Sequence, residues 1–333
     1  MVAGGWVGVR EDPGYATIGG GPAMPTCIPN GVWPTMITPF TDTNTVDYAA
    51  LGELIEWYIE KQVDGLFAVC QSSEMFYLSL EERVDIAKHV VKQAARRVPV
   101  IASAHISDHM PDQIEEMKAI SDTGIDAMVL VTNRLAGAEE SEDAWKRNAE
   151  ILFQAVPDTL FGFYECPYPY KRLLSPELLA WCASTERVLF LKDTSCNIAE
   201  MRAKVEAVQG TDLKIFNANA ATLLETLKLG VSGYSGVMAN FHPELYVWLT
   251  RQWSKEPKRA QELQDFLGVA SLIERQLYPV NAKYYLQLEG LEITLSSRVK
   301  DAAQFTLAER LEVRELRGIT ERCRQGYTMD SIY

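Results

Sequence analysis

The chain has 333 residues, 47% of them hydrophobic, and a formal net charge of −13. This length and composition suit a globular protein with a large core. The acidic balance argues against nucleic acid or an anionic membrane as a partner. No run of roughly 18 uninterrupted apolar residues is present, so a membrane-spanning helix is not expected.

The six cysteines are scattered, and no two of them form a C-x-x-C pair. This usage favours a reducing compartment and indicates neither a zinc site nor a disulfide framework. The N-terminus lacks the cationic start and apolar run of a signal peptide. We therefore expect a cytoplasmic protein. Residues 1–30 are glycine-rich without a helical or strand period, which predicts a tail or, alternatively, an arm on a neighbouring subunit.

From residue 31 onward, short apolar runs alternate with segments of helical spacing. The predicted strands are 32–38, 65–70, 98–103, 126–131, 159–164, 188–191, 213–216 and 231–237. Helix starts are marked by Asp47, by a Ser79/Glu82 capping box and by prolines at 111 and 176. A further helix is expected around residues 145–155, and another ends at Gly230.

The strand-helix unit recurs about every 30 residues, eight times in succession. Continuous apolar strands are typical of a parallel sheet covered by helices, and eight of them predict a closed (β/α)8 TIM barrel over residues 31–242. Residues 243–333 contain only helical patterns and are expected to add the last barrel helix and a C-terminal helical extension. A doubly wound open sheet is the alternative, but no dinucleotide-binding fingerprint supports it.

Active sites of such barrels lie at the C-terminal ends of the strands. Lys192 ends the sixth predicted strand and Tyr164 ends the fifth, so the two side chains are expected to meet at the barrel mouth. A lysine among apolar walls loses hydration, which lowers its pKa and makes the neutral amine a nucleophile toward a carbonyl. The tyrosine could then move the protons that Schiff-base formation needs. A surface lysine paired with Asp193 is the competing interpretation.

Four segments resemble the dihydrodipicolinate synthase and N-acetylneuraminate lyase family of class I aldolases. They are C-Q-S-S-E-M-F-Y-L-S-L-E-E-R at 70–83, Y-E-C-P at 164–167, L-K-D-T-S at 191–195 and Y-P-V-N-A-K at 278–283. The resemblance implies a Schiff-base role for Lys192 and a proton-shuttle role for Tyr164. It also implies a 2-oxo acid substrate, no cofactor and a homo-oligomer, either a tetramer or a dimer.

Several positions depart from the family pattern. Gln71 and Ser72 stand where the family has two hydroxyl residues that hold the pyruvate carboxylate and relay protons. Ser72 and Ser73 are expected to bind that carboxylate, with Gln71 as a further hydrogen-bonding group. Arg134 follows the fourth strand and is a candidate for binding a distal carboxylate. Pro169 falls where the lysine-pathway synthase has its arginine clamp.

Other polar residues carry weaker signals. The glycine-rich segment 230–236 is expected to turn below the pocket, with Tyr234 and Ser235 facing it. His105 and His109 have too few companion ligands for zinc and are expected to be ordinary loop residues, so no metal is predicted. Glu74 is expected to brace its loop by hydrogen bonds.

The leading hypothesis is a Schiff-base lyase or aldolase, or a dehydratase, acting on pyruvate or a 2-keto-3-deoxy sugar acid through Lys192. The first alternative is dihydrodipicolinate synthase itself, which the missing arginine clamp disfavours. The second is a non-catalytic 2-oxo acid binding protein. It accounts for Gln71 and Arg134 but gives no reason to retain Tyr164.

Overall fold

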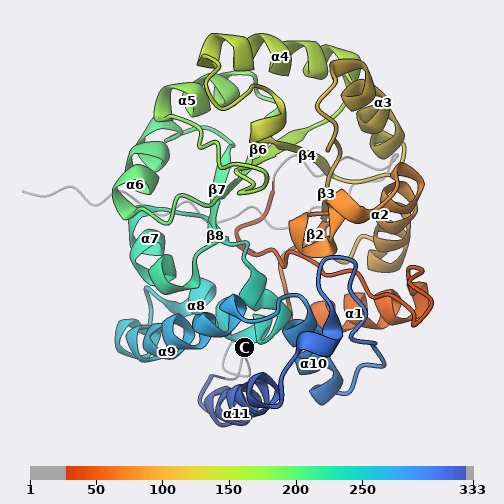
Figure 1. The fold of residues 1–333 in the computed structure, drawn as a ribbon. Coiled ribbons are helices and arrows are strands. Elements are labelled where there is room, and N and C mark those ends of the chain that lie inside the picture. Colours follow the sequence, from red (N-terminus) through yellow and green to blue (C-terminus); the bar gives the residue numbers. More distant parts are fainter. Residues whose placement is uncertain (1–27, 328–333) are drawn as a thin grey trace, which may run out of the picture.

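Parallel strands and helices alternate along the chain in the computed structural model, which describes residues 28–327 (Figure 1). The predicted tail or arm at residues 1–30 therefore lies almost entirely outside the described residues. The strands are β1 Gly31–Val32, β2 Leu66–Ala68, β3 Val100–Ser103, β4 Ala127–Val131, β5 Phe161–Tyr164, β6 Val188–Asp193, β7 Lys214–Asn217 and β8 Gly233–Tyr234.

The strands form one parallel sheet in the order β1-β8-β7-β6-β5-β4-β3-β2. The chain just after β1 then meets β2 through a parallel bridge between Thr35 and Phe67. In that bridge the Met36 amide donates to the Phe67 carbonyl at 3.0 Å. The ring is thereby closed, which confirms the TIM barrel and excludes the open sheet.

Six of the strands are shorter than predicted, β1 and β8 by the most, and β6 is longer. β1 ends before Pro34, which has no amide hydrogen for a ladder, and β8 keeps only two residues of the predicted run. β6 continues through Lys192 and Asp193, because these residues pair with Phe216 and Asn217 of β7. The lysine therefore lies within a strand rather than beyond it.

The barrel helices begin where the sequence signals place them. Asp47 accepts from the Ala49 and Ala50 amides, and Ser79 and Glu82 form the predicted capping box. The helices are α1 Tyr48–Glu60, α2 Leu80–Ala94, α3 Met110–Ser121, α4 Glu142–Ala155, α5 Pro176–Ser184, α6 Ile198–Ala207, α7 Leu223–Leu229 and α8 Pro243–Gln252. They surround the strands on all sides (Figure 1).

The C-terminal extension consists of α9 Pro257–Ala270, α10 Val280–Leu288 and α11 Leu307–Arg324. Figure 1 shows α10 and the segment after it on the α1 and β2 side of the barrel. Arg298, in that segment, forms an ion pair of 2.6 Å with Glu82 of α2 and donates to the Tyr77 carbonyl at 2.9 Å. These contacts fix the extension against the loop that follows β2. The described residues contain no helix long and apolar enough to cross a membrane.

An aromatic cluster fills the barrel interior near β6. The rings of Phe190 and Phe216 stack at 4.6 Å, and Trp33 and Phe67 contact Phe190 edge-on at 5.6 and 6.1 Å. All four side chains are fully buried. Phe190 lies two residues before Lys192 on the same strand, so both side chains point to the same side of the sheet. The lysine thus emerges from an apolar layer.

Candidate active site

Lys192 and Tyr164 meet at the barrel mouth, as the sequence predicts. They are directly paired in the register of β5 and β6. The Lys192 Nζ lies 4.3 Å from the centroid of the Tyr164 ring and 5.9 Å from that of Phe67. Each residue is only 4% exposed. The alternative of a solvated lysine paired with Asp193 is therefore wrong.

Burial governs the charge state of Lys192. Within residues 28–327 its Nζ forms no ion pair, and loss of hydration lowers its pKa to about 8, against the opposing influence of Cys70 and Cys166. A pKa near 8 leaves roughly one tenth of the amine neutral at pH 7, against far less than one part in a thousand for an ordinary lysine. The side chain is thus prepared for nucleophilic attack.

The Tyr164 phenol is oriented by Gln71. Its hydroxyl donates to the Gln71 Oε1 at 3.0 Å, and the Cys166 thiol donates to the same oxygen at 3.5 Å. Burial, with a smaller contribution from Cys166, raises the pKa of Tyr164 well above its ordinary value. The phenol therefore keeps its proton and can donate it to a reacting group close to Lys192.

A cavity of about 410 Å³ opens in front of Lys192. Gln71 and Ser72 line it, and the Ser72 Oγ donates to the Thr35 Oγ1 at 3.2 Å. Sequence reasoning did not place the aromatic and C-terminal residues of the wall. The lining is Gln71, Ser72, Glu74, Phe76, Tyr77, Tyr164, Tyr168, Lys192, Val237, Tyr278, Pro279, Val299 and Lys300. The one available signal was the Y-P-V-N-A-K segment, which begins at Tyr278.

Ser73 is directed away from this cavity. Its Oγ donates to the Met36 carbonyl at 2.6 Å and accepts from the Cys70 amide at 3.0 Å, and the residue is 1% exposed. The hydroxyl is fully engaged in holding the turn after β2. The expectation that Ser73 binds a carboxylate is corrected accordingly, whereas Ser72 keeps a position on the cavity wall.

Arg134 lies in a second cavity of about 300 Å³. Its guanidinium pairs with Asp108 and lies 5.4 Å from the centroid of the Phe76 ring. Because Phe76 lines the Lys192 cavity and Arg134 does not, the arginine stands behind that wall. The prediction that Arg134 reaches the substrate in front of Lys192 is not supported by this geometry.

Tyr234 and Ser235 also do not line the Lys192 cavity in the described part of the chain. The Tyr234 ring stacks on Tyr246 of α8 at 4.2 Å, so it points outward between sheet and helix. Ser235 is completely buried. The expectation fails because β8 has only two residues, and the alternation of faces could not be read from so short a strand.

The two remaining polar interpretations concern His105 and Glu74. His105 is buried, with its Nδ1 2.7 Å from the Gln113 Oε1 and its Nε2 accepting from the Val131 amide at 2.9 Å. Both ring nitrogens are therefore occupied. The Glu74 carboxylate accepts from the Arg298 and Val299 amides at 2.6 and 3.0 Å. It braces the C-terminal segment against the turn after β2.

The turn that presents Gln71 and Ser72 is bounded by two residues with positive φ. Val69 has φ of 46° and Glu74 has φ of 63°. A β-branched residue in this region is unusual, and such conformations persist only where the surroundings enforce them. Here Glu74 is held through its carboxylate, and Val69 is fully buried. The local strain is thus located at the edge of the candidate site.

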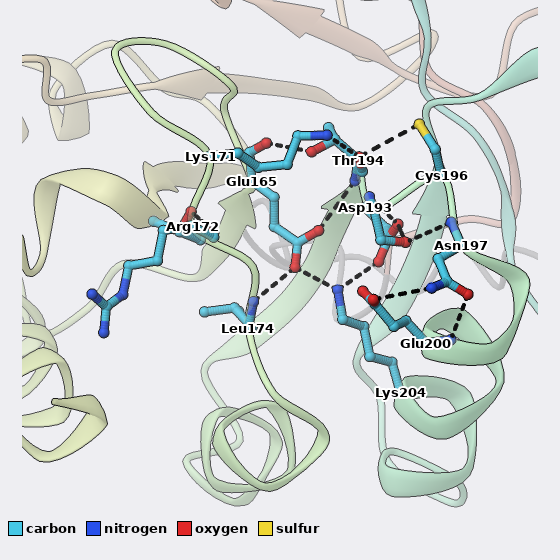
Figure 2. A network of polar contacts seen from close by, with 12 residues as sticks. Glu165, Lys171, Arg172, Leu174, Asp193, Thr194, Cys196, Asn197, Glu200 and Lys204 are labelled. Atoms are coloured by element: carbon cyan, nitrogen blue, oxygen red, sulfur yellow. Dashed lines mark hydrogen bonds and ion pairs between the residues drawn. The ribbon is translucent and has the colours of Figure 1, made fainter. Parts of the chain in front are cut away.

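A second buried lysine lies on the opposite face of the same strands. Figure 2 shows the Lys204 ammonium of α6 between the carboxylates of Glu165 and Asp193. The Nζ distances are 2.5 Å to the Glu165 Oε1 and 2.6 Å to the Asp193 Oδ2. Glu165 directly follows Tyr164, and Asp193 directly follows Lys192. Because the side chains of successive strand residues point to opposite sides of the sheet, the ion network lies on the outer side of the backbone that carries Tyr164 and Lys192.

The carboxylates of this network also hold the backbone. The Glu165 oxygens accept from the Leu174 amide at 2.9 Å and the Thr194 amide at 3.1 Å. Burial raises the pKa of Glu165 to about 7, with the Asp193 charge acting in the same direction and Lys204 opposing it. Burial alone would lower the pKa of Lys204, but the charges of the two carboxylates together raise it.

Comparison with known proteins decides the family. A model of the Dihydrodipicolinate synthetase family matches residues 28–312. The chain belongs to this family. A 4-hydroxy-tetrahydrodipicolinate synthase of Shewanella piezotolerans is 27% identical over 217 residues, covering 65% of this chain and 72% of the relative. The sequence resemblance is thereby confirmed, and the protein is a class I lyase of the dihydrodipicolinate synthetase family.

Solved structures of the family share the fold. The dihydrodipicolinate synthase of Acinetobacter baumannii, complexed with pyruvate, superposes with a TM-score of 0.77 at 24% identity, covering 86% of this chain and 97% of that one. YagE, a prophage protein of E. coli K12 solved with pyruvate, gives a TM-score of 0.79 at 22% identity, covering 89% and 98%. At these sequence identities the structural similarity establishes the barrel fold. The reaction has to be inferred from the residues of the site.

Proposed function

We propose that this protein is a Schiff-base lyase or aldolase whose covalent centre is Lys192 and whose donor substrate is pyruvate or a pyruvate-derived 2-oxo acid. The observation that carries the proposal is the buried Lys192 beside the Tyr164 ring on the wall of a cavity, with no ion pair to any residue in 28–327. The pyruvate complexes of the two solved relatives support the choice of a 2-oxo acid.

In the proposed reaction the neutral Lys192 amine attacks C2 of the 2-oxo acid. Tyr164 donates a proton to the carbinolamine oxygen, which leaves as water, and the iminium forms. The iminium then accepts the electron pair of the C3–C4 bond when that bond breaks, or yields an enamine that forms the bond in reverse. Ser72, on the cavity wall, is proposed to bind the carboxylate, with Gln71 orienting the phenol.

Synthesis of dihydrodipicolinate remains the weaker alternative. A second carboxylate would need a cation in the cavity. Pro169 occupies the clamp position and Arg134 is paired with Asp108 behind Phe76, which leaves Lys300 as the one cation besides Lys192 on the described cavity wall. A binding protein without activity is disfavoured because the Tyr164 phenol and its Gln71 acceptor are retained in a geometry suited to proton transfer.

Reduction with borohydride in the presence of pyruvate tests the proposal. The expected result is a mass increase on the peptide that contains Lys192, absent when pyruvate is omitted. A panel of 2-oxo acids that leaves this peptide unmodified would refute the lyase proposal. An adduct without turnover of any cleavable 2-oxo acid or added aldehyde would favour the binding protein instead.

A further inference from the structure

Aromatic side chains make up a large part of the wall of the Lys192 cavity. Phe76, Tyr77, Tyr168 and Tyr278 line it together with Tyr164. The rings of Phe76 and Tyr168 lie 4.9 Å apart at an angle of 59°. Tyr77 and Tyr168 are 52% and 50% exposed, so two large rings border the opening without being covered. Exposed aromatic surface next to a cavity is typical of a binding site for an apolar or flat ligand.

The polar groups of the same wall are few or already engaged. The Glu74 carboxylate accepts from Ser297 Oγ at 3.0 Å in addition to its two backbone donors, and Lys283 lies 3.3 Å away. Val237, Pro279 and Val299 contribute apolar surface. Lys300 is the one cation of the wall, within the described residues, other than Lys192. The other polar groups of the wall are Gln71, Ser72 and the tyrosine hydroxyls. A polyhydroxylated chain would have to share these few groups, and each of its hydroxyl groups that is buried without a partner carries a cost in free energy.

We propose that the second reacting partner is an aromatic aldehyde, so that the cleaved substrate is a 4-aryl-4-hydroxy-2-oxo acid. This inference rests on the proposed function, and it replaces the sugar acid by an aryl compound. The aryl ring would pack against Phe76 and Tyr168 while the 2-oxo acid half reaches Lys192. A cavity of about 410 Å³ has room for both halves.

The reaction balances without any oxidant or further reactant. After the Lys192 iminium forms, the C4 hydroxyl passes its proton to Tyr164, which lost its own proton to the departing water. The C3–C4 bond breaks, with its electron pair passing to the iminium. The aryl aldehyde, whose carbonyl carbon is C4, departs from C3. The resulting enamine takes up a proton at C3, and water hydrolyses the iminium to release pyruvate and the free lysine. Pyruvate and aldehyde together contain all the atoms of the substrate.

The test measures condensation of pyruvate with benzaldehyde, 2-hydroxybenzaldehyde, glyceraldehyde and aspartate semialdehyde on the full chain. We expect kcat/KM for an aromatic aldehyde to exceed that for the other two by at least about tenfold, which corresponds to loss of the aromatic contacts. Tyr168→Ser should lower the aromatic value about fivefold. The matched control is Tyr327→Ser, because Tyr327 packs on Trp248 outside the cavity and its loss should change neither value.

Formation of the pyruvate adduct on Lys192, measured separately, distinguishes failure of the aryl assignment from failure of the proposed function. If the adduct forms but glyceraldehyde or the semialdehyde reacts as well as the aromatic aldehydes, or if no aromatic aldehyde reacts, the aryl assignment is overturned and the proposed function stands. If no adduct forms, the proposed function fails, and the aryl assignment fails with it. Equal losses in Tyr168→Ser and Tyr327→Ser would also contradict the aryl assignment.

Discussion

Two lysines, one on each face of the same pair of strands, have opposite environments. Lys192 is 4% exposed and Lys204 is 1% exposed. Lys192 faces the barrel mouth among aromatic rings, and its pKa falls to about 8. Lys204 faces outward between Glu165 and Asp193, and its pKa rises (Figure 2). Burial is common to both, so the presence or absence of carboxylates decides which lysine can be a nucleophile.

The two faces also divide the candidate catalytic residues from the residues that stabilise the fold. Tyr164 and Glu165 are neighbours in sequence, as are Lys192 and Asp193, yet each pair divides between the two faces. The inward members form the candidate site, whereas the outward members bind the same backbone segments to α6. Substitutions on the two faces should therefore have different signatures, and the predictions below use that difference.

Lys192→Met should give the largest effect, a loss of activity without a loss of stability. Without the amine no Schiff base can form, so turnover should fall by roughly a thousandfold or more. Removal of an unpaired buried amine should at the same time raise the free energy of unfolding by about 1–2 kcal/mol. Denaturant titration together with steady-state kinetics measures both quantities. A variant that is inactive because it is less stable than the parent would contradict this role.

Lys204→Met should show the reverse signature. It leaves two carboxylates facing each other in the interior, and breaking a buried ion pair in this way costs about 3–5 kcal/mol of folding free energy. The matched control is Lys228→Met, since Lys228 forms an exposed pair with Glu225 and its loss should cost less than about 1 kcal/mol. Similar losses in the two variants would show that the buried network contributes no more than a surface pair.

The pH dependence of adduct formation should report the lowered pKa of Lys192. Only the neutral amine attacks, so at low pyruvate the rate should rise about tenfold per pH unit below the pKa and level off above it. The bend is expected near pH 8, because burial lowers the pKa to about that value. The profile is measured by adding borohydride at fixed times to reactions at several pH values and quantifying the reduced adduct. A rate that still rises steeply at pH 10 would indicate an ordinary lysine.

Glu165→Gln should produce the smallest effect, and the effect should depend on pH. The glutamine amide has one acceptor oxygen where the glutamate has two. We therefore expect the free energy of unfolding to fall by about 1 kcal/mol for each hydrogen bond that is broken. Burial raises the pKa of Glu165 from 4.5 to about 7. The stability that the protonated group provides is complete below pH 4.5 and is lost as the pH rises through about 7. The advantage of the parent over the variant should therefore shrink over that window and then reverse, because the raised pKa outweighs a loss of about 1 kcal/mol. An unchanged difference would mean that Glu165 does not titrate there.

The sequence was sufficient for features that depend on local pattern. The period of the strands predicted the barrel, and two strand ends predicted the meeting of Lys192 with Tyr164. The ion network was not predicted, because Lys204 lies on α6 and the sequence does not say which helical face meets Glu165. Tyr278 and Lys300 were missed as cavity residues because they reach the barrel mouth from the C-terminal extension, through contacts far apart in the chain.

The misplaced residues have a common cause. Ser73 was assigned from the family signature and Arg134 from its position after the fourth strand. Each side chain has a closer partner, the Met36 carbonyl and Asp108 respectively. Tyr234 was assigned to the pocket although it packs on α8. Position along a barrel strand predicts which backbone lies at the mouth. The direction of a side chain depends on partners that only the folded structure supplies.

Reductive trapping with pyruvate at pH 7, with both lysines quantified in the same digest, shows which of the two buried amines is the covalent centre. Native protein should carry the adduct on Lys192 at an occupancy about a hundredfold or more above that on Lys204, since only one amine is appreciably neutral. Protein unfolded before treatment should show nearly equal occupancy, which controls for peptide detection. Equal labelling of the two lysines in the native protein, or labelling of Lys204 alone, would contradict the account.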